Sequence, residues 1–134
     1  MSSSKEVALP WPDRGLSPNS RMHWAKKMRL ARAYRHTCKV RTLNAIRAGK
    51  WDVARLRAAV DAGLPVSVTL EFYPPDRRRR DDDNVVAAFK PGRDGLADAL
   101  KIDDCHFRIR PVLCRDEPVP GGAVRVVIED GTES

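Results

Sequence analysis

Residues 66–73 read Val-Ser-Val-Thr-Leu-Glu-Phe-Tyr, and Pro74 and Pro75 follow at once. Apolar and polar side chains alternate along this stretch, which is the pattern of a β-strand with one buried face. The two prolines end the strand, because a proline nitrogen cannot donate to a sheet ladder. The flanking sequence is therefore expected to supply neighbouring strands and the helices that cover the apolar face.

The part before this strand predicts one short strand and two helices. The short strand runs from Lys5 to Leu9. A long helix is expected over residues 22–48, with Asn19 or Ser20 as its N-cap, because apolar side chains recur there at three- and four-residue steps. The side chains of that face are Trp24, Met28, Ala31, Tyr34, Cys38, Thr42 and Ala45. A second helical piece is expected over residues 51–62.

The part after this strand predicts two short helices followed by two strands. The elements are a helix from Val85 to about Pro91, a helical turn from Asp94 to Leu100, a strand from Phe107 to Leu113, marked as an edge by Pro111, and a strand from Val124 to Ile128. Together these elements predict one α+β domain over residues 1–134, with a small mixed β-sheet of about four strands and helices packed against it. Residues 1–4 and 130–134 are expected to be flexible tails.

The composition indicates one globular domain with a polyanionic partner. The 134 residues are 42% hydrophobic, which is enough for one core, and 25 Lys and Arg stand against 18 Asp and Glu, a net charge of +7. Residues 1–50 alone carry twelve basic and two acidic side chains, a concentration typical of proteins that bind phosphate backbones. A soluble basic surface without a partner is the alternative.

The sequence also argues against secretion, membrane insertion and a cysteine-based metal site. No apolar run approaches the roughly 18 residues of a membrane span, and no apolar signal segment follows the polar N-terminus. The three cysteines, Cys38, Cys105 and Cys114, form neither an even set nor a C-x-x-C pair. We therefore expect a protein of the reducing cytoplasm that has no membrane partner.

The segment with the strongest chemical signal is residues 76–84, Asp-Arg-Arg-Arg-Arg-Asp-Asp-Asp-Asn, between a strand and a helix. Arginine binds phosphate through paired hydrogen bonds, and clustered aspartates are the oxygen ligands that Mg²⁺ prefers. A metal-dependent nuclease needs both in one place. If the acids stay extended, Asp81 and Asp83 point to the same side and Asp82 points away. A helix cap formed by Asp83 or Asn84 is the structural alternative for one acid.

A second acidic pair, Asp103 and Asp104, lies about twenty residues downstream, just before the strand that begins at Phe107. The two acidic regions each adjoin a strand, so we expect them to meet at one end of the sheet and to share a metal ion. A polar turn between helix and strand is the alternative for this pair.

Four segments occur in a characteristic order and spacing. They are Leu9-Pro10-Trp11-Pro12, Pro74 through Asn84, Asp94-Gly95-Leu96 and Asp103-Asp104. In these segments the chain resembles the RusA family of Holliday-junction resolvases, from Leu9 to Asp104. The arginine run followed by D-x-D-N is the most specific of the shared motifs. Ser17-Pro18-Asn19 followed by His23-Trp24 is similar to the version found in phage and prophage members.

The resemblance implies a small homodimeric endodeoxyribonuclease that depends on Mg²⁺, with Mn²⁺ as an alternative ion. Such enzymes nick two opposed strands of a four-way DNA junction symmetrically during recombination and repair. By position, Asp81, Asp83 and Asp104 match the family's acidic metal-binding and catalytic residues, and Asp103 is the fallback for Asp104. The resemblance also implies a bacterial host cytoplasm.

The chain departs from the better-known members at the catalytic lysine. The matching position is Ala87, whereas Lys90 lies nearly one further turn along the same helix, where phage-like members also have lysine. Residues three apart on a helix share a face, so we expect Lys90 to act in catalysis. The residues expected to bind the DNA backbone are Arg77, Arg78, Arg79, Arg80, Lys26 and Lys27.

Two other functions fit the same residues. One is a nuclease of flaps or other branched DNA with the same site. The other is a non-catalytic protein that binds DNA or RNA, in which the acids merely balance the arginines.

Overall fold

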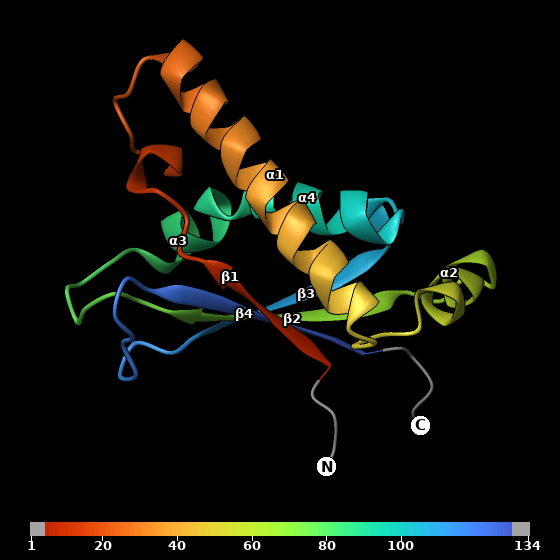
Figure 1. Ribbon diagram of the computed structural model, residues 1–134. Coiled ribbons are helices and arrows are strands. Elements are labelled where there is room, and N and C mark those ends of the chain that lie inside the picture. Colours follow the sequence, from red (N-terminus) through yellow and green to blue (C-terminus); the bar gives the residue numbers. More distant parts are fainter. Residues whose placement is uncertain (1–4, 130–134) are drawn as a thin grey trace.

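A four-stranded mixed sheet forms one of two layers in the computed structural model, which describes residues 5–129 (Figure 1). The strands are β1 (Glu6–Pro10), β2 (Val66–Tyr73), β3 (Phe107–Leu113) and β4 (Ala123–Glu129), in the order β1-β4-β2-β3. β4 is antiparallel to β1 and β2, whereas β2 and β3 are parallel. The single α+β domain is confirmed. The two expected tails lie outside the described residues.

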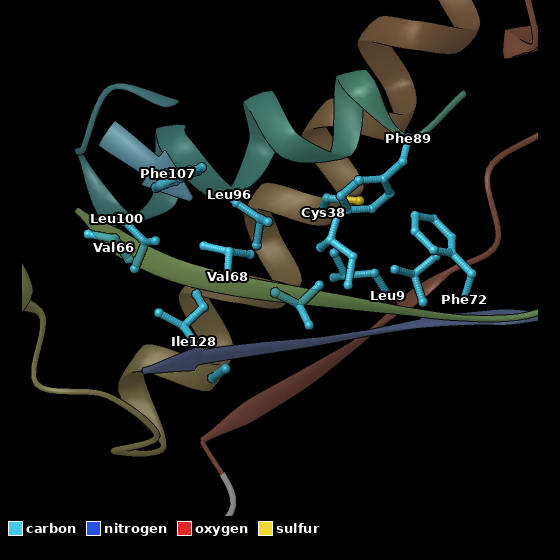
Figure 2. Close-up of a cluster of buried hydrophobic side chains, with 14 of the residues drawn as sticks. Leu9, Cys38, Val66, Val68, Phe72, Phe89, Leu96, Leu100, Phe107 and Ile128 are labelled. Atoms are coloured by element: carbon cyan, nitrogen blue, oxygen red, sulfur yellow. The ribbon is translucent and has the colours of Figure 1, made fainter. Parts of the chain in front are cut away.

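The central strand β2 has the alternation that its sequence predicts. Val66, Val68, Leu70 and Phe72 are buried, and the residues between them are half-buried. β4 repeats the pattern, with Val124, Val126 and Ile128 buried. The two central strands therefore direct one continuous apolar face toward the helices, where Phe72 meets Phe89 edge to face (Figure 2).

Helices form the second layer, and α1 and α4 lie on the same face of the sheet (Figure 1). The helices are α1 (Trp24–Arg47), α2 (Val53–Asp61), α3 (Asp82–Ala88) and α4 (Lys90–Leu100), with the 3₁₀ turns η1 (Arg14–Leu16) and η2 (Asp104–His106). α1 and α4 are in close contact at Gly95, where an added Cβ would lie 2.5 Å from the carbonyl oxygen of Arg35. Glycine is therefore required at this crossing.

The predicted boundaries differ from the structure at two helix starts. His23 rather than Asn19 or Ser20 caps α1, since its Nδ1 accepts a hydrogen bond from the N–H of Ala25. Pro91 lies in the first turn of α4 and does not end a helix. Proline is tolerated there because the first turn of a helix leaves its N–H groups without helical acceptors.

The expected apolar face of α1 is buried only in its later turns. Tyr34, Cys38 and Ala45 are buried, but Trp24 and Met28 are 68% and 50% exposed. The physical reason is that the first turns of α1 stand away from the sheet, so no strand lies beneath them (Figure 1).

No helix within residues 5–129 is long and apolar enough to cross a membrane.

Gly95→Ala tests the crossing of α1 and α4. Helix propensity alone predicts that alanine raises the free energy of unfolding by about 0.5–1 kcal/mol. The close approach predicts the opposite, a loss of about 1–3 kcal/mol from overpacking, measured by urea unfolding. A more stable variant would contradict the packing described here.

Candidate functional site

The candidate site lies where the parallel strands β2 and β3 end. The arginine loop (residues 74–81) follows β2, and residues 114–117 follow β3, so both leave the sheet at the same edge. Backbone hydrogen bonds hold them together, from Cys114 N–H to Phe72 O at 2.9 Å and from Val119 N–H to Pro74 O at 3.0 Å. A cavity of about 770 Å³ opens here. Open α/β sheets commonly bind ligands at the carboxyl ends of their strands.

The four arginines of the arginine loop divide into two kinds. Arg80 is held within the protein, because its guanidinium pairs with the Asp76 carboxylate at 2.8 Å and lies 5.8 Å from the ring centre of Trp11. Arg77 and Arg79 line the cavity, are exposed, and have no ion-pair partner within residues 5–129. Arg78 lies 3.9 Å from Asp76, at the limit of an ion pair. Arg77 and Arg79 are thus the arginines available to an anion.

The acids that follow these arginines do not form an extended run. Asp81 is the N-cap of α3, and its Oδ1 accepts hydrogen bonds from the N–H groups of Asp83 at 2.9 Å and Asn84 at 3.3 Å. Asp82 and Asp83 are already helical. The extended backbone that would direct Asp81 and Asp83 to the same side is therefore not present, and the cap is Asp81 rather than Asp83 or Asn84.

Asp82 and Asp83 have different surroundings. Asp82 pairs with Arg115, whose Nε donates to its carboxylate at 3.2 Å, and this hydrogen bond holds the pKa of Asp82 below its usual range. Asp83 also lines the cavity, is exposed, and its carboxylate has no hydrogen-bond or ion-pair partner in the described part of the chain. Asp83 is thus the acid of this segment that is open to a ligand.

Asp104 and Lys90 meet in a separate cluster. Lys90 Nζ lies 2.7 Å from Asp94 Oδ1 and 2.9 Å from Asp104 Oδ2, and Arg93 Nε lies 3.1 Å from the same Asp104 oxygen. The hydrogen bond to Asp94, followed by that to Asp104, raises the pKa of Lys90. The fallback acid Asp103 points into its own turn, where its Oδ1 accepts the N–H of Cys105 at 2.9 Å.

The two acidic regions do not meet at one end of the sheet. Asp81 and Asp83 follow the carboxyl end of β2, whereas Asp103 and Asp104 precede the amino end of β3. Because β2 and β3 are parallel, the carboxyl end of β2 and the amino end of β3 lie at opposite ends of the strands. Within residues 5–129 no group of three His, Cys, Asp or Glu side chains is able to hold a metal ion. As arranged in one chain, Asp81, Asp83 and Asp104 do not fit one shared ion.

The two lysines expected to bind DNA lie apart from the arginine loop, in the first turn of α1. Lys26 is exposed, whereas Lys27 Nζ donates to the carbonyl oxygen of Ser17 at 3.0 Å and so braces the loop before the helix. Of the two, Lys26 is the one free to bind phosphate.

The sequence interpretation missed three members of these clusters. Arg115 lies on the segment after β3, and only the parallel pairing with β2 brings it to Asp82. Asp94 and Arg93 were detectable, because Asp94 is four residues after Lys90 and Arg93 three residues after it, spacings that share one helix face.

Comparison with known proteins finds a relative that aligns with almost the whole of this chain. The chain is 40% identical over 129 residues to an uncharacterized protein of Xylella fastidiosa (strain Temecula1), and the alignment covers 96% of this chain and 78% of that protein. No protein-family model matches the chain. The relative's name states no activity, so the function has to be argued from the site.

The capping role of Asp81 predicts a specific pattern of stability. Asp81→Ala is expected to lower the free energy of unfolding by about 0.5–2 kcal/mol, because two N–H groups of α3 lose their acceptor. Asp81→Asn should stay within about 0.5 kcal/mol of wild type, since asparagine caps as well as aspartate. Urea unfolding measures both, and equal losses for the two variants would contradict the cap.

Proposed function

The chain belongs to the family of this Xylella fastidiosa protein, and we propose that it is an endodeoxyribonuclease that resolves four-way DNA junctions by paired symmetric nicks in recombination and repair. One observation carries the proposal. Arg77 and Arg79, which have no protein partner among the described residues, line the same cavity as the equally unpartnered carboxylate of Asp83. Exposed guanidinium groups beside an exposed acid suit a phosphodiester better than a neutral ligand.

Charge supports DNA as the substrate. No Asp or Glu occurs between Arg14 and Trp51, a stretch that contains eleven Lys and Arg. Of those on α1, only Arg35 pairs with an acid within residues 5–129, namely Asp98 at 2.7 Å. Such a surface gains affinity for a phosphate backbone by releasing its condensed counterions.

The reaction would use residues from the cavity beside the arginine loop and from the cluster of Lys90 and Asp104. In the proposal, Arg77 and Arg79 hold the phosphates on either side of the cut. Water attacks the phosphorus as the bond to the leaving oxygen breaks, the free carboxylate of Asp83 accepts the proton of that water, and Lys90 offers positive charge and a proton to the leaving oxygen. Lys90 is fully charged in its present contacts, because Asp94 and Asp104 raise its pKa. Reaching the phosphate would require Lys90 to leave one of these acids.

A divalent ion, Mg²⁺ or alternatively Mn²⁺, is part of the proposal on the chemistry of the donors, which are hard carboxylate oxygens. When bound, such an ion neutralises charge on the scissile phosphate and activates water. The proposed ligands remain Asp81, Asp83 and Asp104. Within residues 5–129 these three carboxylates do not gather at one point, and Lys90 and Arg93 occupy Asp104, so one chain offers the ion no single site.

The proposal includes a homodimer in the bacterial cytoplasm. Two symmetric nicks on opposed strands call for two sites related by a twofold axis, which a homodimer supplies.

Cleavage of a synthetic four-way junction with Mg²⁺ tests the proposed reaction. Wild type should give paired nicks at symmetric positions. Asp83→Asn should lower the nicking rate at least 100-fold and keep junction binding, because removing an acid does not weaken attraction to phosphate. Asp61→Asn, the same change at an exposed position on α2, is the matched control and should cleave as wild type does.

Three results would count against this function. They are robust cutting in EDTA, an unaffected Asp83→Asn variant, and a wild type that nicks no DNA with Mg²⁺ or Mn²⁺. Faster cutting of flaps or splayed duplexes than of junctions would move the proposal to a branched-DNA nuclease with the same site.

One observation favours a second candidate, a non-catalytic DNA-binding protein. Asp81, Asp82 and Asp104 all serve as partners within the protein, to the α3 backbone, to Arg115, and to Lys90 with Arg93. Such internal contacts are expected if these acids serve only to neutralise basic side chains and the protein backbone. This candidate predicts steeply salt-dependent binding and no nicking with any divalent ion.

The two unpartnered arginines predict a change in the salt dependence of DNA binding. Arg77→Gln and Arg79→Gln should each weaken binding at low salt and reduce the slope of log K against log salt by about one, because each removes one phosphate contact. Fluorescence anisotropy at several salt concentrations measures the slope. Arg55→Gln, at an exposed site on α2, is the control and should leave it unchanged. An equal decrease for all three would contradict a specific role of the arginine loop.

A further inference from the structure

Trp24, the first residue of α1, is a large apolar side chain left in solvent. It is 68% exposed, and the imidazole of His23 stacks on its ring with centroids 5.9 Å apart and planes at 29°. Met28, one turn further along the same face, is 50% exposed. Neither lies over the sheet, because the first turns of α1 stand away from it (Figure 1). Trp24 is thus an aromatic side chain that touches the His23 ring and is otherwise mostly exposed.

The charge around Trp24 indicates what kind of partner it fits. Exposed basic side chains surround the first turns of α1 on several sides, at Arg21, Lys26, Arg29 and Arg32, and no acid occurs between Arg14 and Trp51. A second copy that approached this end of α1 would carry the same net positive charge, which opposes a symmetric contact between two copies. An aromatic ring among unneutralised basic groups is the combination by which proteins bind unpaired nucleotides.

Three neighbouring hollows lie between the arginine loop and the residues just before α1. The cavity beside the loop shares Arg80 with a second hollow of about 310 Å³. The second shares Arg14 and Ser17 with a third of about 670 Å³, which reaches His23 and Lys26. A polynucleotide lying along this path would have phosphates near Arg77, Arg79 and Arg14, and one end of the path lies at His23, the residue next to Trp24.

We propose that Trp24, supported by His23, stacks on an unpaired base at the branch of the DNA. The proposal rests on the proposed function for its substrate and adds a recognition element for branched structure. In an intact duplex every base is stacked on its neighbours, so Trp24 has no free base to contact. At a branch, bases can leave the stack, and the ring can take the place of the lost neighbour.

Binding measured in EDTA, where no metal-dependent cutting occurs, tests this role. The probes are a four-way junction with 2-aminopurine beside the branch and a duplex of the same sequence. Trp24→Ala should weaken junction binding about tenfold, which corresponds to about 1.4 kcal/mol and lies within the range for one stacked base. The loss on the duplex should be under twofold. Trp24→Phe should restore junction binding to within about threefold of wild type.

Two further readouts separate stacking from charge and from misfolding. Trp24→Ala should leave the slope of log K against log salt unchanged, whereas Lys26→Ala should reduce it by about one. Wild type and Trp24→Phe should quench the 2-aminopurine fluorescence, and Trp24→Ala should not. Because Trp24 is mostly exposed, the alanine variant is expected to unfold at the same urea concentration as wild type.

Specific outcomes would overturn the inference. Equal losses on junction and duplex would show that Trp24 does not recognise the branch. A change in molecular mass of Trp24→Ala by light scattering would place Trp24 in an interface between copies. A wild type that nicks nothing but passes the EDTA tests would remove the enzymatic proposal and leave this one. A wild type that nicks junctions while Trp24→Ala binds them normally would remove this inference alone.

Discussion

The parallel pairing of β2 with β3 determines where the charged segments of this protein lie. Parallel neighbours cannot be joined by a tight turn, so the chain must cross over through helices, here α3 and α4. The crossover starts at the carboxyl end of β2 with the arginine loop and returns to the amino end of β3 through Asp103 and Asp104. One pairing therefore gathers the arginine loop with Arg115 and separates Asp83 from Asp104.

The structure also shows how a run of like charges is accommodated without a ligand. Asp76 neutralises Arg80, Arg115 neutralises Asp82, and the amide groups of α3 take up the charge of Asp81. These contacts leave Arg77, Arg79 and Asp83 unneutralised at one cavity. Leaving these three charged side chains without a partner does not stabilise the fold. The unneutralised groups are therefore the ones to which we assign contact with a substrate.

Much of the fold could be predicted from the sequence, because strand alternation in residues 66–73 and the turn residues around it act locally. The predictions were wrong where the structure depends on contacts between residues that are far apart in the sequence. Pro91 was predicted to end a helix, but it lies in the first turn of α4, where proline is also tolerated. The burial of Trp24 could not be judged from its spacing, since that depends on where α1 leaves the sheet. The arginine loop was recognised from its sequence alone. The contact of Arg115 with Asp82 could not be predicted, because it depends on the order of the strands in the sheet. The position of Asp104 could not be predicted either, because it depends on the direction of β3 relative to β2.

α1 begins in solvent with an exposed aromatic residue, Trp24. The later turns of α1 gain stability from burying Tyr34 and Cys38 against the sheet and α4. Its first turns have no such burial and carry basic groups that repel one another, so packing alone does not explain an exposed Trp24. Binding of a polyanion would remove the repulsion, and an unpaired base would cover the ring. Both demands are met by one ligand, a DNA strand that leaves its duplex near the start of α1.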